Sequence, residues 1–257
     1  MDKLLSILIP NFETHIFLMI MVVFFIGGLV KGFLGIGLPA AAMALLTLFI
    51  NPLDAIALII VPIIFTNALQ FASSAGKKQI IIDYKLCAIA IIVSIFITSI
   101  FINAYPSFLI TIAIGVAMVA FSLNQLTGFK IPVGPGSLWQ IIAGTTAGIL
   151  GGVSSIWSPP IVMYLFARNV SKETFIAATG FLFLVGSFPL ALGYFLSGVL
   201  TLGIILNSFI GLIIVLAGFK TGELLRQKIS QELFKKIVLW GFLIMGLRLI
   251  YTGTLII

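Results

Sequence analysis

The sequence predicts an all-α polytopic membrane protein made of two inverted-topology repeats, and three observations lead to this fold class. Hydrophobic residues make up 61% of the 257 positions and charged residues only 8%, whereas ordinary soluble domains carry about 25% charged residues. Charge-free runs such as 86–129 and 174–219 are long enough for about two helical spans each, and too long for barrel strands of about 10 residues. Two glycine-rich stretches, one in each half, share a pattern of helix-breaking residues.

Ten hydrophobic segments follow from the apolar runs and the turn residues that separate them. Asn51-Pro52, Gly76 and Tyr105-Pro106 are clear turn signals. The first, second, sixth and seventh segments are short for a full crossing, and the sequence leaves open whether they span the membrane or form re-entrant hairpins. The segments extend over about 15–32, 37–50, 54–75, 86–104, 107–126, 138–150, 157–168, 172–197, 200–218 and 234–253.

The basic residues give the segments an orientation. Lys and Arg gather in every second connection, and membrane proteins keep such loops on the cytoplasmic side. We therefore expect both termini outside the cytoplasm, and we attribute the formal net charge of +7 to these loops rather than to nucleic-acid binding. The basic connections carry Lys77, Lys78, Lys85, Lys130, Arg168, Lys172, Lys220, Arg226, Lys228, Lys235 and Lys236, whereas those at 51–53, 105–106, 151–156 and 198–199 carry no Lys or Arg.

The segments divide into two repeats of about five each. We expect a first membrane repeat over 1–126, a linker over 127–137 that is rich in Gly and Pro, and a second membrane repeat over 138–257. Five crossings, or three crossings plus a hairpin, are an odd number, so the halves have opposite orientations and are related by a pseudo-two-fold axis in the membrane plane. Each repeat opens with a Gly/Pro-interrupted helix pair.

The two interrupted stretches are GLVKGFLGIGLP at 28–39 and GTTAGILGGVSSIWSPP at 144–160. The second lies within 131–167, which has no charge, so it sits at membrane depth, where unpaired backbone groups are costly. Such a break is tolerated where it packs in protein or lines a wet cavity, and paired breaks indicate a transporter's binding site. The halves align through Gly28, Gly32, Leu34, Gly35, Pro39, Met43, Leu45 and Ala57 against Gly144, Gly148, Leu150, Gly151, Pro159, Met163, Leu165 and Ala177.

Both breaks expose a helix N-terminus at depth. Ser158-Pro159 has the pattern of an N-cap followed by proline at the first helical position, and Pro39 starts the corresponding half-helix in the first repeat. A helix N-terminus offers free N–H groups and a positive dipole end, which favour an anion. The alternative is close helix packing by small residues. The predicted substrate-binding residues are Lys31, Gly32, Gly35, Asn67, Gln70, Gly151, Ser154, Ser155 and Ser158.

Lys31, Asn67, Gln70 and the nearby Trp157 each leave an alternative open. Lys31 snorkels to the cytoplasmic surface if the first segment spans the membrane fully, and lies deep enough to attract an anion if that segment is re-entrant. Thr66, Asn67 and Gln70 form a polar cluster on one face of the third segment. We expect Asn67 and Gln70 to line the cavity, although amides at this depth also bond neighbouring helices. Trp157, beside the second break, either lines the pathway or anchors the chain at the membrane interface.

Missing residue types exclude several classes of function. All acidic residues lie in tails, loops or segment ends, and His15 begins the first segment, so no carboxylate or histidine is placed for a proton relay. The sequence contains no Walker A sequence, HExxH motif, cysteine cluster or Ser/His/Asp set, so we expect no enzyme, no cofactor and no bound metal. The single cysteine, Cys87, is interpreted as a packing residue. Asp2 and Lys3 occur without a clear basic region or cleavage site, so we expect no removable signal peptide.

The motifs KGFLGIGLP and AGILGGVSSIWSPP resemble the sulfite exporter TauE/SafE family of bacterial membrane permeases (DUF81). The resemblance covers nearly the whole chain. It implies movement of small sulfur-containing anions such as sulfite, sulfoacetate or thiosulfate across the bacterial inner membrane. Many members have a run of three glycines in the first motif, whereas this chain has Gly35-Ile36-Gly37 with Lys31 upstream, like a subgroup with a basic residue there. This departure leaves the individual substrate open.

These features together predict a secondary transporter, in the direction of export, whose small anionic substrate binds between the two breaks. An anion channel with the same site, and a non-transporting membrane subunit of a larger complex, are the alternatives. The lipid bilayer is the expected environment and nucleic acid is not an expected partner, while the sequence leaves open whether the chain forms a homo-oligomer. Without a proton relay, we expect facilitated diffusion, anion exchange, or coupling to Na⁺ through backbone carbonyls and Ser/Thr oxygens.

Overall fold

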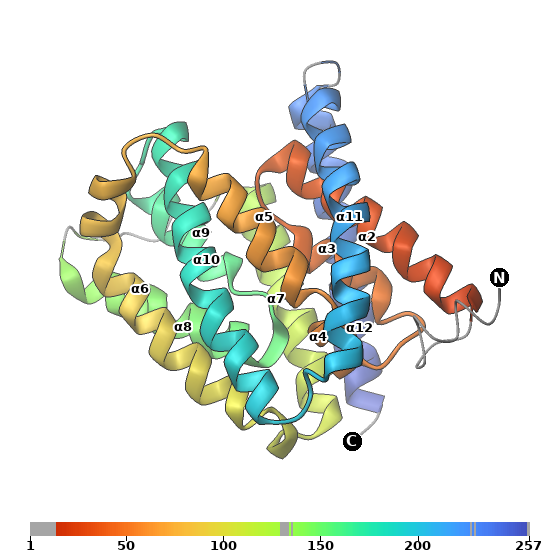
Figure 1. Cartoon of the computed structure of the whole chain (residues 1–257). Helices are drawn as coiled ribbons and strands as arrows, with labels where there is room; N and C mark the ends of the chain where they lie inside the picture. Colours follow the sequence, from red (N-terminus) through yellow and green to blue (C-terminus); the bar gives the residue numbers. More distant parts are fainter. Residues whose placement is uncertain (1–13, 129–133, 135, 227, 229, 256–257) are drawn as a thin grey trace.

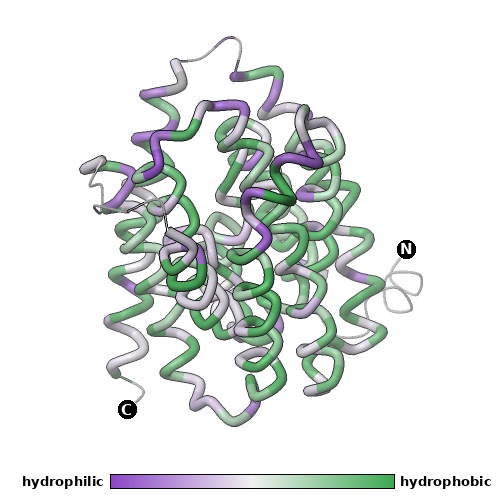
Figure 2. Tube along the Cα trace, turned by 90° about the vertical axis from the view of Figure 1, so that its left-hand side faces the viewer, coloured by the Kyte–Doolittle hydropathy of each residue, from purple (hydrophilic) through white to green (hydrophobic). Residues whose placement is uncertain are grey.

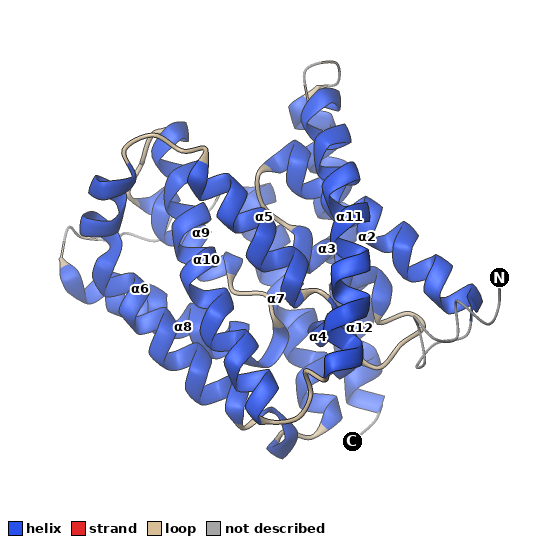
Figure 3. Ribbon diagram, viewed as in Figure 1, coloured by secondary structure: helices blue, strands red, loops and turns tan. Residues whose placement is uncertain are grey.

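A computed structural model describes residues 14–128, 134, 136–226, 228 and 230–255. Over these residues every regular element is a helix, as the sequence predicts (Figure 3). The N-terminal residues on which the signal-peptide prediction rests, and residues 129–133 and 135 of the predicted linker, lie outside the described part of the chain.

The helices follow the predicted segments closely. Six helical stretches in the described part of the chain, of 20 to 25 residues, are long and apolar enough to cross a membrane. The elements are α2 (Thr14–Leu34), α3 (Leu38–Leu46), α4 (Pro52–Leu58), α5 (Ile60–Ala72), α6 (Lys77–Ile100), the 3-10 turn η1 (Ile102–Ala104), α7 (Ser107–Thr127), α8 (Ser137–Ser154), α9 (Ser158–Ala167), α10 (Lys172–Leu196), α11 (Leu202–Leu225) and α12 (Gln231–Leu255).

Several helix ends differ by a few residues from the predicted segments, and α11 extends to Leu225 rather than to about 218. One early start and one interruption have clear local reasons. The fourth segment begins at Lys77 rather than at about residue 86, because the left-handed Gly76 (φ 66°) ends the preceding turn and the helix starts with polar residues. The third segment is interrupted between α4 and α5. Pro62 has no N–H, so the Leu58 carbonyl four residues earlier lacks a helical donor. This carbonyl instead accepts a hydrogen bond from Ser208 Oγ of α11 at 2.5 Å.

Close helix crossings at glycines hold the two halves of the chain together. α2 packs along α11, and a Cβ atom at Gly32 would lie 2.0 Å from the Phe219 carbonyl oxygen. α8 packs along α6 in the same manner, and a Cβ atom at Gly148 would lie 1.8 Å from Ser94 Oγ. Small residues allow such close approach in membrane proteins. α7 packs on α12 and α5 on α10, so each of these pairs joins an early helix to a late one (Figure 1).

Hydropathy is distributed unevenly along the molecule. Apolar residues cover the long helices, and hydrophilic segments gather at the end that is uppermost in Figure 2. The end of α11 and the start of α12 lie at this end, and the end of α12 lies at the opposite end (Figure 1). An apolar body with a polar end fits insertion in a lipid bilayer.

Candidate functional site

The first helix break is a short turn between α2 and α3. Gly35 and Gly37 both lie in the left-handed region, with φ of 80° and 97°. Glycine adopts these angles without the steric cost that other residues meet. α3 then begins with Pro39 in its first turn, where the missing N–H leaves no helical hydrogen bond unmade. The first break is therefore built from residues suited to reversing the chain and starting a new helix.

The second break separates α8 from α9. Ser155 turns the chain at φ 58°, although it is not a glycine. Ser154 stabilises the turn, because its Oγ accepts a hydrogen bond from the Ile156 N–H at 3.1 Å and donates one to the Leu150 carbonyl at 2.6 Å. α9 begins with Ser158 itself, and prolines occupy its first turn. The prediction that Ser158 is the N-cap is wrong by one residue, because Trp157 holds that position and makes no side-chain capping hydrogen bond. A non-glycine residue at a left-handed angle persists where the surroundings over-determine it, and such residues cluster at functional sites.

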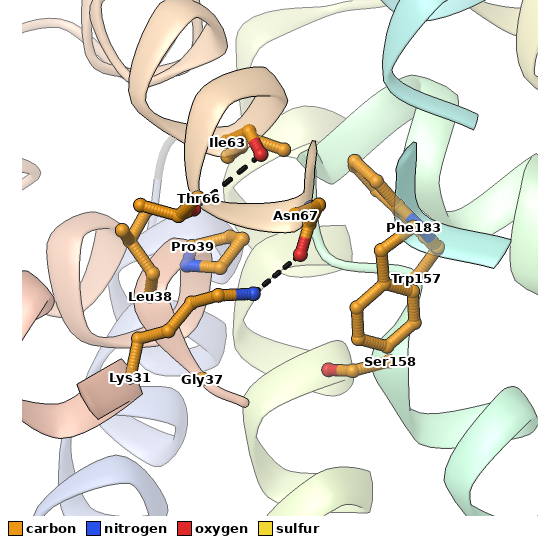
Figure 4. A pocket seen from close by; sticks show the side chains of 10 residues that line it. All are labelled: Lys31, Gly37, Leu38, Pro39, Ile63, Thr66, Asn67, Trp157, Ser158 and Phe183. Carbon is orange, nitrogen blue, oxygen red and sulfur yellow. Dashed lines mark hydrogen bonds between the residues drawn. The ribbon is translucent and has the colours of Figure 1, made fainter. Parts of the chain in front are cut away.

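A small cavity of about 20 Å³ lies between the two breaks (Figure 4). It has room for about one water molecule. The first turns of α3 and α9 approach it from opposite sides (Figure 4). We call it the Lys31 cavity. Its lining residues are Lys31, Gly37, Leu38, Pro39, Ile63, Thr66, Asn67, Trp157, Ser158 and Phe183.

Lys31 supplies the charge of this cavity and is only 2% exposed. Its Nζ donates a hydrogen bond to Asn67 Oδ1 of α5 (Figure 4). α2 is long enough to cross a membrane, and Lys31 nevertheless stays buried instead of reaching the surface. No carboxylate is among the described lining residues, so the ammonium has a neutral partner there and no counter-ion. A buried cation without counter-charge is costly, which makes the cavity receptive to an anion.

Other polar groups and an aromatic wall complete the cavity. Figure 4 shows the Ser158 hydroxyl directed toward the Lys31 side of the cavity. Thr66 Oγ1 is already engaged, because it donates to a carbonyl of its own helix at 2.7 Å. The Trp157 indole forms a wall and meets Phe183 edge-on, with ring centroids 6.0 Å apart. Its Nε1 is buried without a hydrogen-bond partner in the described part of the chain, and it lies next to α10.

Comparison with known protein families decides the broader identity of the chain. The family profile described as Sulfite exporter TauE/SafE matches residues 20–249, which include every residue that lines the Lys31 cavity. The chain belongs to the TauE/SafE family. Neither the curated proteins nor the solved structures gave a match. With this family and six apolar candidate spans, the TauE/SafE protein is a multi-pass membrane protein of a transporter family, and the resemblance seen in the two motifs is confirmed.

The Lys31 cavity of this TauE/SafE protein contains part of the predicted set of residues. Asn67 lines the cavity, whereas Gln70, one turn further along α5, does not. Gln70 Nε2 donates to the Ile176 carbonyl at 2.9 Å and to Thr179 Oγ1 at 3.1 Å, so it ties α5 to α10. This is the helix-bonding role that the sequence left open. The predicted residues that line the cavity are Lys31, Pro39, Asn67 and Ser158.

The remaining predicted residues shape the surroundings of the cavity. Gly32 permits the close crossing of α2 and α11. A Cβ atom at Gly151 would lie 2.7 Å from Trp157 Cβ, so this glycine gives the second break room to fold back on α8. The two serines of the second break and the glycine after α2 form the turns themselves. Gly32, Gly35, Gly151, Ser154 and Ser155 are not among the residues that line the cavity in this structure.

Some lining residues were missed by the sequence analysis. Ile63 and Phe183 are apolar residues in apolar segments, so nothing in the sequence sets them apart. Leu38 is equally inconspicuous. Gly37 carried a usable signal, because a glycine two residues before a helix-starting proline marks the end of a turn. Thr66 was visible as a member of the polar cluster, but its role could not be separated from that of Asn67.

Proposed function

We propose that this TauE/SafE protein is a secondary transporter that exports small sulfur-containing anions, such as sulfite, sulfoacetate or thiosulfate, across a bacterial inner membrane. The single observation that carries the proposal is the buried Lys31, which lines a small cavity without a carboxylate among its described lining residues, between two helix breaks. A small oxyanion would supply the missing negative charge. The anionic class is supported by residues of this chain, and the sulfur-containing class is supported by the family.

The first turns of α3 and α9 support the same substrate charge. Each helix N-terminus carries a partial positive charge of about half a unit. The first turns of both helices contain proline, which has no backbone N–H, so each first turn offers fewer backbone donors. We therefore assign most of the binding to the helix dipoles, the Lys31 ammonium and the Ser158 hydroxyl. Asn67 Oδ1 accepts a hydrogen bond from the ammonium, and a bound anion would share or replace this contact.

Helix packing supports the proposed inverted repeat of residues 1–126 and 138–257, with 127–137 as the linker. If the halves are superimposed, α2 corresponds to α8 and α11 corresponds to α6. Because α2 packs on α11 and α8 packs on α6, the exchange of halves turns one observed pair into the other. The α7–α12 pair and the α5–α10 pair each join corresponding helices of the two halves, so the exchange of halves leaves each pair unchanged. A pseudo-two-fold axis produces this kind of packing scheme.

The size of the Lys31 cavity favours a carrier over a channel. A cavity of about 20 Å³ has room for about one water molecule and is too small for a sulfur oxyanion, so passage requires a change of conformation. In inverted-repeat transporters this change is largely a rocking of one repeat against the other. From the distribution of Lys and Arg, we place both termini outside the cytoplasm and the α11–α12 connection inside.

Flux measurements on the purified protein in proteoliposomes test this function. We expect saturable sulfite transport that is accelerated by unlabelled sulfite on the opposite side. Lys31→Gln removes the charge and keeps a polar side chain, and it should reduce transport by about tenfold or more, because a charged hydrogen bond is worth about 1.5–3 kcal/mol. Lys78→Gln is the matched control, since Lys78 is exposed and lies outside the cavity.

The same measurements separate the proposal from its alternatives. Sulfite flux that neither saturates nor responds to counterflow would indicate an anion channel. Absence of flux for sulfite, sulfoacetate and thiosulfate alike would indicate a membrane subunit without transport activity. Unchanged transport in Lys31→Gln would remove Lys31 from the site.

A further inference from the structure

A second and larger cavity, of about 180 Å³, lies beside the first break. It is bounded by the turn after α2 and by α7, α9, α10, α11 and α12. The end of α11 and the start of α12 contribute to it, so it lies toward the polar end of the molecule seen in Figures 1 and 2. We call it the basic vestibule. Its lining residues are Phe33, Leu34, Ile36, Phe121, Gln125, Phe166, Lys172, Phe175, Ile176, Arg226, Lys235 and Leu239.

Three cations from three different helices line the basic vestibule. Lys172 is the first residue of α10, Arg226 caps the C-terminus of α11, and Lys235 lies near the start of α12. Arg226 and Lys235 are half-buried, so solvent screens their charges less than those of freely exposed side chains. No Asp or Glu is among the described residues of the lining. The basic vestibule therefore has a single sign of charge.

The neighbouring carboxylates do not neutralise these cations. Glu223 forms an ion pair with Lys220 at 3.2 Å, and Glu232 forms one with Lys236 at 2.8 Å. Glu173 is exposed in the first turn of α10 and is not part of the lining. The acidic residues that are close in the sequence are thus either paired with other lysines or exposed outside the vestibule.

A buried donor also lines the basic vestibule. Gln125 Nε2 is buried and has no hydrogen-bond partner among the residues that the structure describes. A buried donor left unsatisfied is unfavourable, and an oxyanion bound in the vestibule would satisfy it. Phe166 and Phe175 form an aromatic part of the wall, stacked with ring centroids 5.3 Å apart. Low-dielectric walls strengthen the attraction between the cations and an anion.

The turn of the first break separates the basic vestibule from the Lys31 cavity. Leu34 and Ile36 line the vestibule, while Gly37 and Leu38 line the Lys31 cavity. The two spaces are therefore adjacent along a single turn of the chain. The vestibule holds about 180 Å³ and the Lys31 cavity about 20 Å³, so the vestibule has the room for a hydrated anion that the inner cavity lacks.

We propose that the basic vestibule is a second anion-binding site, which captures a small sulfate-like or sulfonate-like oxyanion through Lys172, Arg226, Lys235 and Gln125. The binding itself does not depend on transport. Its role as the site that loads the Lys31 cavity rests on the proposed function, and the positive-inside orientation places it on the cytoplasmic side, where an exporter collects its substrate. Clefts with one sign of charge raise the local concentration of counter-ions and their on-rates by about 10- to 1,000-fold.

Charged thiol reagents test the electrostatic potential of the basic vestibule. Leu34→Cys, in a Cys87→Ala background, places one thiol in its wall. We compare the labelling rates of an anionic sulfonate-bearing methanethiosulfonate and a cationic one of similar size. Replacing Lys172, Arg226 and Lys235 together by Gln should lower the anionic-to-cationic rate ratio by about tenfold or more. Sulfate should protect the thiol in the parent and not in this triple variant, and sulfate is used because sulfite would itself cleave the mixed disulfide.

The matched control replaces Lys77, Lys78 and Lys85 together by Gln. These lysines are exposed on α6 outside the vestibule, and their loss changes the net charge equally. We expect the rate ratio and the sulfate protection to stay within about twofold of the parent. Equal losses in both triple variants, or no sulfate protection in the parent, would overturn the site. If the vestibule triple does not fold, Lys172→Gln alone, at an exposed position, should lower the ratio in the same direction, and an unchanged ratio would overturn the site.

This design also separates the site from the transport proposal. Sulfate protection in a parent protein that transports no anion would support the binding site and remove its loading role. Transport together with an absence of protection would overturn the vestibule site and leave the proposed function in place.

Discussion

Lys31 is charged and almost completely buried. A buried charge is unfavourable, and for this reason we assign Lys31 to anion binding in the proposed function. Asn67 provides one hydrogen-bond acceptor, but an amide does not replace the counter-charge that water or a carboxylate would supply. The fold therefore keeps an unfavourable charge in a place where it can attract an anion. Function at the expense of stability is a common feature of binding sites.

We predict that Lys31→Met keeps or raises the thermal stability of the empty protein while it removes most of the stabilisation by substrate. Lys31→Met removes the cost of keeping a charge out of water, and even whole buried ion pairs can often be replaced by apolar side chains without loss of stability. In the parent, sulfite at 100 times its dissociation constant adds about 2.7 kcal/mol. Thermal unfolding in detergent, with sulfite or with chloride at equal ionic strength, measures both effects. The prediction would be contradicted by a Lys31→Met protein that is less stable than the parent and whose melting temperature still rises with sulfite as much as that of the parent.

Asn67 allows a second prediction at the same scale. Asn67→Leu leaves the Lys31 ammonium without its acceptor, so we expect a loss of at least about 1–3 kcal/mol in the free energy of unfolding. Asn67→Asp supplies a counter-ion, so it should fold well and yet inhibit transport by competing with the substrate anion. Denaturation together with sulfite flux distinguishes these outcomes. Full transport in Asn67→Asp would show that Lys31 does not bind the substrate.

The helices are positioned by glycines at their crossings, and these glycines are more important for packing than for the site. We predict that Gly32→Ala and Gly148→Ala both lower the free energy of unfolding by several kcal/mol. The new Cβ atoms would lie 2.0 Å and 1.8 Å from atoms of α11 and α6, respectively. Gly241→Ala in α12 is the control, because nothing lies within 4 Å of its Cβ position. Gly241→Ala should leave the free energy of unfolding unchanged or raise it slightly, because alanine favours the helix over glycine at an exposed position.

The two crossings should respond differently to a second substitution. At Gly148 the nearest atom belongs to the Ser94 hydroxyl, so Ser94→Ala should restore part of the stability of Gly148→Ala. At Gly32 the nearest atom is a backbone oxygen, which no substitution removes. Equal melting temperatures for Gly148→Ala with and without Ser94→Ala would show that the crossing is not limited by this contact.

The elements were predictable from the sequence because a membrane leaves few options for an apolar segment. Charge-free runs must form helices, and Gly, Pro and Asn residues mark their ends. The interruption of α4 and α5 at Pro62 was not predicted, since proline inside a transmembrane helix is tolerated when another group satisfies the freed carbonyl. That group is Ser208, about 150 positions away, and only the tertiary structure brings it there.

The candidate site was predictable in part for the same reasons. Lys31 and Ser158 stood out because charge and helix-breaking residues are rare at membrane depth. The choice between Asn67 and Gln70 could not be made, because the two amides are one helical turn apart and only the position of α10 separates their roles. The basic vestibule could not be predicted from the sequence, since its three cations lie on different helices that only the tertiary structure brings together.

At the scale of the whole molecule, a small inner cavity lies next to a wider vestibule toward the polar end. The one-sided distribution of Lys and Arg predicts a topology that can be measured. In intact cells and a Cys87→Ala background, Ser197→Cys should react with a membrane-impermeant maleimide, and Lys228→Cys should react only after the membrane is permeabilised. The reverse pattern would contradict the orientation and place the basic vestibule on the outer side.

The last prediction concerns what drives transport, and it rests on the whole distribution of acidic residues. A proton-coupled carrier usually needs an Asp, Glu or His that binds and releases a proton within the membrane. In the part of the chain that the structure describes, neither the Lys31 cavity nor the basic vestibule is lined by any of these. The remaining routes are facilitated diffusion, anion exchange, and coupling to Na⁺ through backbone carbonyls and Ser/Thr oxygens at the broken helices.

We therefore predict that a pH gradient alone does not drive accumulation of a strong-acid anion. Methanesulfonate is suitable because it carries no proton of its own near neutral pH. Proteoliposomes with an imposed pH gradient, zero membrane potential and no Na⁺ should reach equal concentrations of it on both sides. A Na⁺ gradient in parallel vesicles, and trapped sulfite as an exchange partner, then distinguish the remaining routes. Accumulation above equilibrium that survives Lys31→Gln would reveal a proton site elsewhere in the protein, because a substitution that removes the Lys31 ammonium would have left the coupling intact.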